Sequence, residues 1–218
     1  MQTTREKLVD TARRLFAERG VDPVSLREIS RAAEQRNVSA LQYHFGDREG
    51  LLRAVLTPYE RDVDARRGAV LDELATRSAP GLRDFADALV RPPAALLENP
   101  GGREYLRIVG QLISRPVADD AGADVFLASG GLSRWRGAVR PLLSDEDLAL
   151  HRRFTAIQLT YAELGRRAEL SRRNHELFTS HLVDLAAAVL AAPISAETRR
   201  LLAARAMGRS RRGAGRSG

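Results

Sequence analysis

Residues 25–45, SLREISRAAEQRNVSALQYHF, govern the architecture of the N-terminal part of this chain. Ser25 followed three residues later by Glu28 matches a capping box, a pattern that opens many helices. The stretch forms two short helical segments around a polar turn at 34–37, each with an apolar inner face: Leu26, Ile29 and Ala33 on the first, Val38, Leu41 and Phe45 on the second. This arrangement is typical of a helix-turn-helix, whose second helix presents side chains to the DNA major groove.

Amphipathic helices are expected on both sides of this stretch. The preceding one can be capped by Thr3 or Thr4, ends at Gly20 and carries an apolar stripe formed by Leu8, Ala12, Leu15 and Phe16. The following one can be capped by Asp47 and is apolar at Leu51, Leu52 and Val55, and Pro58 is expected to kink or end it. Residues 1–53 are therefore predicted to form a three-helix DNA-binding domain.

The rest of the chain also has helical periodicity, so the predicted fold class is all-α. Pro92-Pro93 and the glycine-bearing stretch 118–131 are expected to interrupt the helices. Ser144 and Asp147 signal the start of a helix that continues to Ala168. A last strong helix is expected over about 175–192, and a dimer seam is predicted on it at Phe178, Leu182, Leu185 and Val189. Residues 54–195 are thus predicted to form a helical regulatory, ligand-binding and dimerisation bundle.

The C-terminal residues 196–218 are predicted to form a short helix followed by a disordered, arginine-rich tail. The chain has a formal net charge of +7, and the seven arginines of residues 199–218, with no acid among them, account for it. Residues 1–53 have a balance of only +2, from ten basic and eight acidic side chains. The overall charge is therefore poor support for specific DNA binding.

Composition limits the other classes of function. The sequence has 44% hydrophobic residues, no cysteine and four histidines that lie far apart, so disulfides, a metal site and a cofactor are not expected. It has neither an apolar run long enough to span a membrane nor an N-terminal signal core, and a cytoplasmic location is expected. Because no nucleophile, base and orienting group form a recognisable set, an enzyme is not expected.

The N-terminal segments together resemble the tetracycline-repressor (TetR) family of bacterial transcription regulators. The resemblance spans about residues 4–56 and includes the first amphipathic helix, SLREISRAA, the turn, LQYHF and DREGLL. It implies a homodimer that binds a roughly palindromic DNA operator, and relatives usually repress transcription and release DNA when a small molecule binds the C-terminal half. The chain departs from the family pattern at Glu34, where glycine is common, and at Gln42, where many relatives have an aromatic residue. Its turn is also one residue longer than the commonest form in the family.

Side-chain chemistry assigns roles within this resemblance. Gln42 can bond an adenine edge and the Ala40 methyl can pack on a thymine methyl. Tyr43 and Ser39 are expected at a base edge or a phosphate, and His44 resembles the family position that bonds the DNA backbone. The remaining predicted contacts are phosphate contacts near helix N-termini, from Ser25, Arg27 and Arg48, and groove or backbone contacts from Arg36 and Asn37.

Polar and aromatic residues that could line an effector pocket between helices are Tyr105, Gln111, Trp135, His151, Phe154, Gln158 and Tyr161. Two alternatives remain open, a helical protein-interaction module and a DNA-coating protein that lacks sequence preference and binds through its arginine tail.

Overall fold

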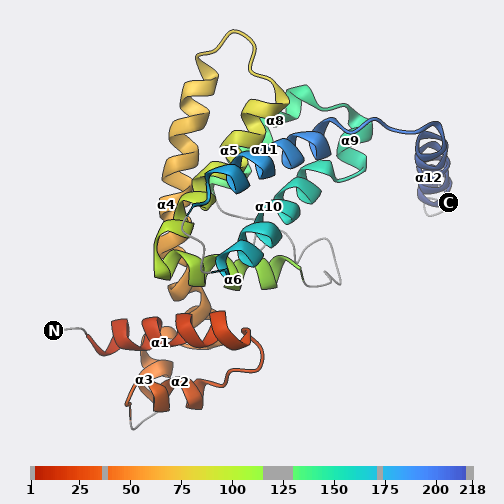
Figure 1. The fold of residues 1–218 in the computed structure, drawn as a ribbon. Helices are drawn as coiled ribbons and strands as arrows, with labels where there is room; N and C mark the ends of the chain where they lie inside the picture. The colour runs from red at the N-terminus through yellow and green to blue at the C-terminus, as the bar shows by residue number, and fades with distance from the viewer. Residues whose placement is uncertain (1–2, 36–38, 115–129, 171–173, 215–218) are drawn as a thin grey trace.

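The computed structural model describes residues 3–35, 39–114, 130–170 and 174–214, and every regular element among them is a helix. This confirms the all-α prediction. Three short helices form the N-terminal unit: α1 (Thr4–Arg19), α2 (Leu26–Ala32) and α3 (Ser39–Phe45). The long helix α4 (Arg48–Ala75) starts beside them and runs into the larger helical part, so it crosses the expected domain boundary at residue 53 (Figure 1).

The predicted caps of the N-terminal unit are present. Thr3 and Glu6 form a capping box at α1, and Ser25 and Glu28 form one at α2. The Asp47 carboxylate accepts a hydrogen bond from the Gly50 backbone N–H at 2.7 Å, which caps α4. Gly20 follows α1 with φ +88°, a conformation that glycine adopts without steric penalty. Local sequence signals therefore determine where these helices begin and end.

The expectation that prolines would end helices is wrong at Pro92-Pro93, and α4 does not end at Pro58. Pro58 lies inside α4, and both Pro92 and Pro93 lie in the last turn of α5 (Leu82–Ala94), which is followed by the 3₁₀ helix η1 (Ala95–Glu98). A proline leaves the carbonyl four residues earlier without its usual donor. For Pro92 that carbonyl belongs to Ala88, and Arg67 Nε of α4 donates to it at 3.3 Å. Tertiary packing thus compensates for the missing backbone hydrogen bond.

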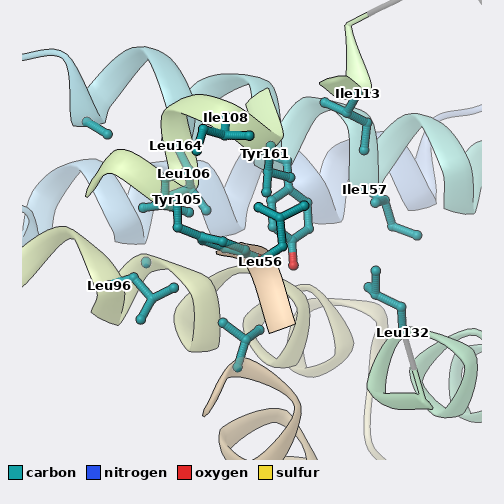
Figure 2. Close-up of a cluster of buried hydrophobic side chains, with 14 of the residues drawn as sticks. Leu56, Leu96, Tyr105, Leu106, Ile108, Ile113, Leu132, Ile157, Tyr161 and Leu164 are labelled. Atoms are coloured by element: carbon teal, nitrogen blue, oxygen red, sulfur yellow. The ribbon is translucent and has the colours of Figure 1, made fainter. Parts of the chain in front are cut away.

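The core of the larger part lies between α4, α5, α6 (Pro100–Ile113), α8 (Gly130–Val139), α10 (Arg152–Ala168) and α11 (Glu176–Ala191). Helices α6 and α10 cross closely at two glycines, since a Cβ on Gly110 would lie 3.0 Å from Gly165 Cα. Around this crossing, leucine, isoleucine and tyrosine side chains from several helices form one apolar cluster (Figure 2). Close backbone approach and burial of apolar surface hold α6 and α10 together here.

Three further elements differ from expectation. The helix opened by Ser144 is divided into α9 (Asp145–Ala149) and α10, because His151 adopts a left-handed conformation with φ +56° between them. Residues 118–129 of the expected connection lie outside the described residues, but Gly130 and Gly131 begin α8 instead of belonging to a loop. Helix α12 extends over Ala196–Ala214, much further than the short helix expected, and stands apart from the helical core (Figure 1).

The 3₁₀ helix η2 (Arg140–Leu142) completes the described elements. No single helix of the described chain is long and apolar enough to cross a membrane; α11 together with residues 196–205, bent by 59°, passes the same test of length and composition as a pair.

Candidate nucleic-acid interface

Helix α3 presents the outer face expected of a recognition helix. The side chains of Gln42, Tyr43 and His44 are exposed, and Tyr43 has 85% of its surface accessible. Leu41 is buried at 2% and Phe45 is half-buried against the core, so α3 has an apolar inner side and a polar outer side. The Tyr43 and His44 rings meet edge to face with centroids 5.1 Å apart. A large exposed tyrosine beside an amide side chain is a suitable surface for base edges and phosphates.

Part of the predicted contact set cannot be placed. Arg36 and Asn37 lie outside the described residues, as does Val38 of the expected inner face. Ser39 and Ala40 belong to the first turn of α3, but their side chains are outside the description. The turn before them includes Glu34 at φ +57°, so a non-glycine residue occupies a left-handed position. L-amino acids other than asparagine and aspartate rarely adopt this conformation because Cβ approaches the backbone.

The start of α2 is organised around Glu28. Its carboxylate accepts hydrogen bonds from the Ser25 backbone N–H at 2.8 Å and the Ser25 hydroxyl at 2.9 Å, and it pairs with Arg19 at 3.0 Å. These bonds lower the pKa of Glu28 to about 2, with the Ser25 backbone as the largest cause. The Ser25 side chain is therefore already used as a cap, whereas Arg27 in the first turn is exposed and has no partner among the described residues.

Arg48 holds the N-terminal unit together. Its Nη2 donates to the carbonyls of Val21 and Asp22, and to that of Val24 at 2.6 Å, while its guanidinium lies 5.9 Å from the Phe16 ring centroid. Three carbonyls of the α1–α2 connection thus bind one arginine of α4. This geometry gives Arg48 a structural role, and its predicted phosphate contact finds no support in it.

Close packing also fixes α3 against α4. A Cβ on Gly50 would lie 2.0 Å from the Phe45 carbonyl oxygen, a distance that only glycine permits. On the side of α1, the Arg5 guanidinium lies 5.4 Å from the ring centroid of the same residue, Phe45. The orientation of the recognition helix is therefore set by α1 and by the first turn of α4.

The N-terminal unit is attached to the larger part through an ion pair that the sequence did not reveal. Arg13 Nε of α1 donates to Glu104 of α6 at 2.6 Å, and Arg13 Nη1 donates to Asp10 at 2.8 Å. The Arg13 guanidinium lies 5.8 Å from the Tyr59 ring centroid, and the Tyr59 and Tyr105 rings stack at 5.3 Å. This junction joins α1, α4 and α6.

The residues predicted to line an effector pocket do not form one group. Tyr105 and Tyr161 are buried together in the apolar cluster (Figure 2). Trp135 is completely buried and donates to the Phe85 carbonyl at 2.7 Å, as an ordinary core residue does. His151 is exposed at the α9–α10 break, and Gln111 approaches Gly20 at the end of α1. For these two residues the pocket prediction is wrong, because the helix break and the α1–α6 contact turn them elsewhere.

The two remaining members lie on α10. Gln158 is half-buried and donates to the Ile113 carbonyl at 3.4 Å, and Phe154 is half-buried against the core. The sequence analysis did not single out two charged residues, Glu60 and Arg67, that lie in the buried stripe of α4. Their spacing of seven residues from each other, within a run of apolar core positions, is the signal that could have identified them.

The predicted dimer seam divides between two faces of α11. Leu182 is buried at 1% inside the subunit, so its assignment to the seam is wrong. Leu185 is 39% exposed, and Phe178 and Val189 are half-buried. Leu177, one turn before His181, is 83% exposed. Helix α11 packs one apolar side on α5 and α10 and leaves a second side uncovered.

A three-helix unit whose third helix, α3, has an exposed polar outer face is typical of helix-turn-helix DNA-binding proteins. Residues 8–55 match the family model described as bacterial regulatory proteins of the tetR family. The N-terminal unit is therefore similar to the DNA-binding unit of TetR-family transcription regulators. No significant match is found among curated protein sequences.

One solved structure shows the same fold, and two others are similar to this chain. RHA5900, a probable transcriptional regulatory protein, is 21% identical with a TM-score of 0.51, over 88% of this chain and 99% of that one. A TetR-family regulator from Streptomyces coelicolor A3 is 21% identical over 86% and 94% of the two chains, with a TM-score of 0.47. RolR, solved with resorcinol, is 25% identical over 88% and 95%, with a TM-score of 0.42.

Proposed function

We propose that this regulator is a ligand-responsive repressor that binds a roughly palindromic operator as a homodimer. The observation that carries the proposal is the face of α3, where Gln42, Tyr43 and His44 are exposed on a helix whose other side is packed into the N-terminal unit. Such a helix can enter the major groove without any rearrangement of the unit. A role on chromosomal DNA also implies a cytoplasmic location.

The uncovered side of α11 supports dimerisation. Leu177, His181 and Leu185 fall on successive turns and are exposed, flanked by half-buried Phe178 and Val189. Exposed leucines on a helix that is otherwise packed are typical of a subunit interface. Two copies joined there would carry two recognition helices, and the half-sites of the operator would then be separated by about one helical turn of DNA or a multiple of it.

The junction of α1, α4 and α6 supports a route from effector to DNA. Arg13 binds Glu104 across the boundary, and Tyr59 stacks on Tyr105, which is buried in the regulatory core. A ligand that moved α4 or α6 would therefore change the position of α1 and α3. For such a ligand to release DNA, it must bind the DNA-free conformation more tightly than the DNA-bound one.

The test is selection of binding sites from a random double-stranded DNA library at about physiological salt, where non-specific binding is weak. We expect enrichment of a two-fold-symmetric site with the wild-type protein and its loss with Gln42→Ala plus Tyr43→Ala. Arg83→Ala, which removes an exposed cation from the regulatory part, is the matched control and should select the same site.

Two results would contradict the proposal. Recovery of no preferred sequence by a folded wild-type dimer would favour a protein-interaction module. Loss of all binding on deletion of residues 208–218, with the α3 variant unaffected, would favour a DNA-coating protein that binds through its tail.

A further inference from the structure

Helix α12 lies apart from both the helical core and the DNA-binding unit. Figure 1 shows α12 beyond the end of α11, whereas α1–α3 lie at the opposite end of the subunit. An ion pair ties the start of α12 to α9, since Arg199 Nε lies 3.1 Å from a Glu146 carboxylate oxygen. After this pair the helix is open to solvent, with Leu201 59% exposed and Arg205 exposed as well. The surface of α12 is therefore available to another molecule.

The positive charge of the chain is concentrated in this helix and the residues after it. The formal net charge is +7, and residues 199–218, here called the cationic end, contain seven arginines and no acid. Residues 1–198 therefore balance to zero. Arg200 and Arg205 are exposed, and neither has an ion pair among the described residues. The sequence of the cationic end continues with Arg209, Arg211, Arg212 and Arg216.

The chemistry of arginine favours a phosphate partner. A guanidinium presents a planar fork of N–H donors that can bind two phosphate oxygens at once. Duplex DNA carries one negative charge per about 1.7 Å of its axis, so a dense group of arginines without acids is complementary to it. Such contacts are independent of sequence, because every nucleotide presents the same phosphate.

The apolar residues of α12 do not suit the other common polyanion, an anionic membrane. A helix that lies on a membrane needs a continuous apolar face opposite its basic one. In α12 the exposed Leu201 and the exposed Arg205 are four residues apart and so share one side of the helix. Leu202, the neighbouring leucine, is half-buried. Phosphate contacts need no apolar face, so nucleic acid is the better match.

We propose that α12 and the cationic end form a second DNA-binding surface, which binds the phosphates of duplex DNA without sequence preference. Because α12 and α3 lie at different ends of the subunit, the two surfaces contact separate stretches of DNA (Figure 1). A protein that holds an operator through α3 then holds a second duplex segment through α12 and bridges the two. The inference goes beyond the proposed function, since operator recognition needs only α3.

The first test measures affinity for a duplex of random sequence, about 30 base pairs long, by fluorescence anisotropy of the full-length protein over a range of salt concentrations. The glutamine variant combines five substitutions in α12: Arg200→Gln, Arg205→Gln, Arg209→Gln, Arg211→Gln and Arg212→Gln. We expect it to bind at least about tenfold more weakly than wild type at low salt. Its slope of log K against log salt should be flatter by about 2 or more, because each lost phosphate contact removes about 0.9.

The matched control replaces the same five arginines with lysine. It should keep the wild-type salt slope, because lysine also neutralises a phosphate. Both variants should keep the wild-type Tm within about 2 °C, since substitutions at exposed positions have small effects on stability. Vesicles of phosphatidylserine and phosphatidylcholine in equal parts are the competing polyanion, and wild type should bind the duplex more tightly than the vesicles at equal phosphate concentration.

The second test measures bridging directly. A biotinylated duplex that carries the site selected by wild type is captured on streptavidin, and a fluorescent duplex of random sequence is added with the protein. At about physiological salt, wild type and the lysine variant should retain the fluorescent duplex. The glutamine variant should bind the captured site but release the second duplex.

Four results would overturn the proposal: equal salt slopes for wild type and the glutamine variant, a lysine variant as weak as the glutamine variant, tighter binding of wild type to vesicles than to DNA, or no retention of the second duplex by wild type. Site selection separates this inference from the proposed function. If wild type selects a palindromic site but the glutamine variant binds random DNA equally well, only the α12 surface is contradicted. If wild type selects no site but the glutamine variant loses affinity for random DNA, only the proposed function is contradicted.

Discussion

Single residues in the N-terminal unit carry constraints that bear on DNA binding. Glu34 occupies a left-handed position with φ +57° in the turn before α3. Glycine avoids the steric cost there but loses more backbone entropy, so Glu34→Gly should raise the free energy of unfolding by about 0.5–1 kcal/mol, measured by urea denaturation. Glu34→Val is the matched control and should lower it by about 1–2 kcal/mol. A loss of stability in the glycine variant would contradict the left-handed assignment.

The acid behaviour of Glu28 gives a second prediction for a single side chain. Its pKa is lowered from 4.5 to about 2 in the folded protein by its bonds to Ser25 and Arg19. The unfolded state therefore takes up the proton first as pH falls, and the stability due to Glu28 is complete above about pH 4.5 and disappears as pH approaches 2. The Tm difference between wild type and Glu28→Gln should shrink over this range. A difference independent of pH would refute the cap.

At the scale of the element, α11 is apolar on two sides that have different roles. Leu185→Glu places a charge on the uncovered side and should convert dimers to monomers in sedimentation or light scattering, with little change in Tm per subunit. Leu182→Ala removes a side chain that is 1% exposed, and should lower the free energy of unfolding by about 2–5 kcal/mol while dimers persist at low temperature. Persistent dimers in Leu185→Glu would remove this face from the interface.

At the scale of the whole molecule, the Arg13–Glu104 pair joins the DNA-binding unit to α6 at 2.6 Å. The side chains are 19% and 23% exposed, so the contribution should be about 1 kcal/mol, and Arg13→Met should speed amide hydrogen exchange in α1–α3 by roughly fivefold. Arg66→Met, which breaks an exposed pair on α4, is the control. Equal exchange in both variants would show that the junction does not restrain the N-terminal unit.

Sequence patterns were sufficient for the DNA-binding unit because its signals are local. The capping residues Ser25 and Asp47, the glycine after α1 and the inner face of α3 all act within one or two helical turns. The same patterns gave the all-helical class and the outer face of α3 with Gln42 and Tyr43. Each of these depends on interactions between residues close in the chain.

Other features depend on contacts between distant segments, and only the tertiary structure decided them. Helix α5 continues through Pro92 because Arg67, from another helix, binds the carbonyl that proline leaves free. Which apolar side of α11 is buried depends on α5 and α10, so Leu182 lies in the core and Leu185 on the surface. Arg48 of α4 binds carbonyls of the α1–α2 connection, which lies more than twenty residues earlier in the chain. Periodicity gives the faces of a helix, whereas the partner of each face is fixed by the packing of the whole chain.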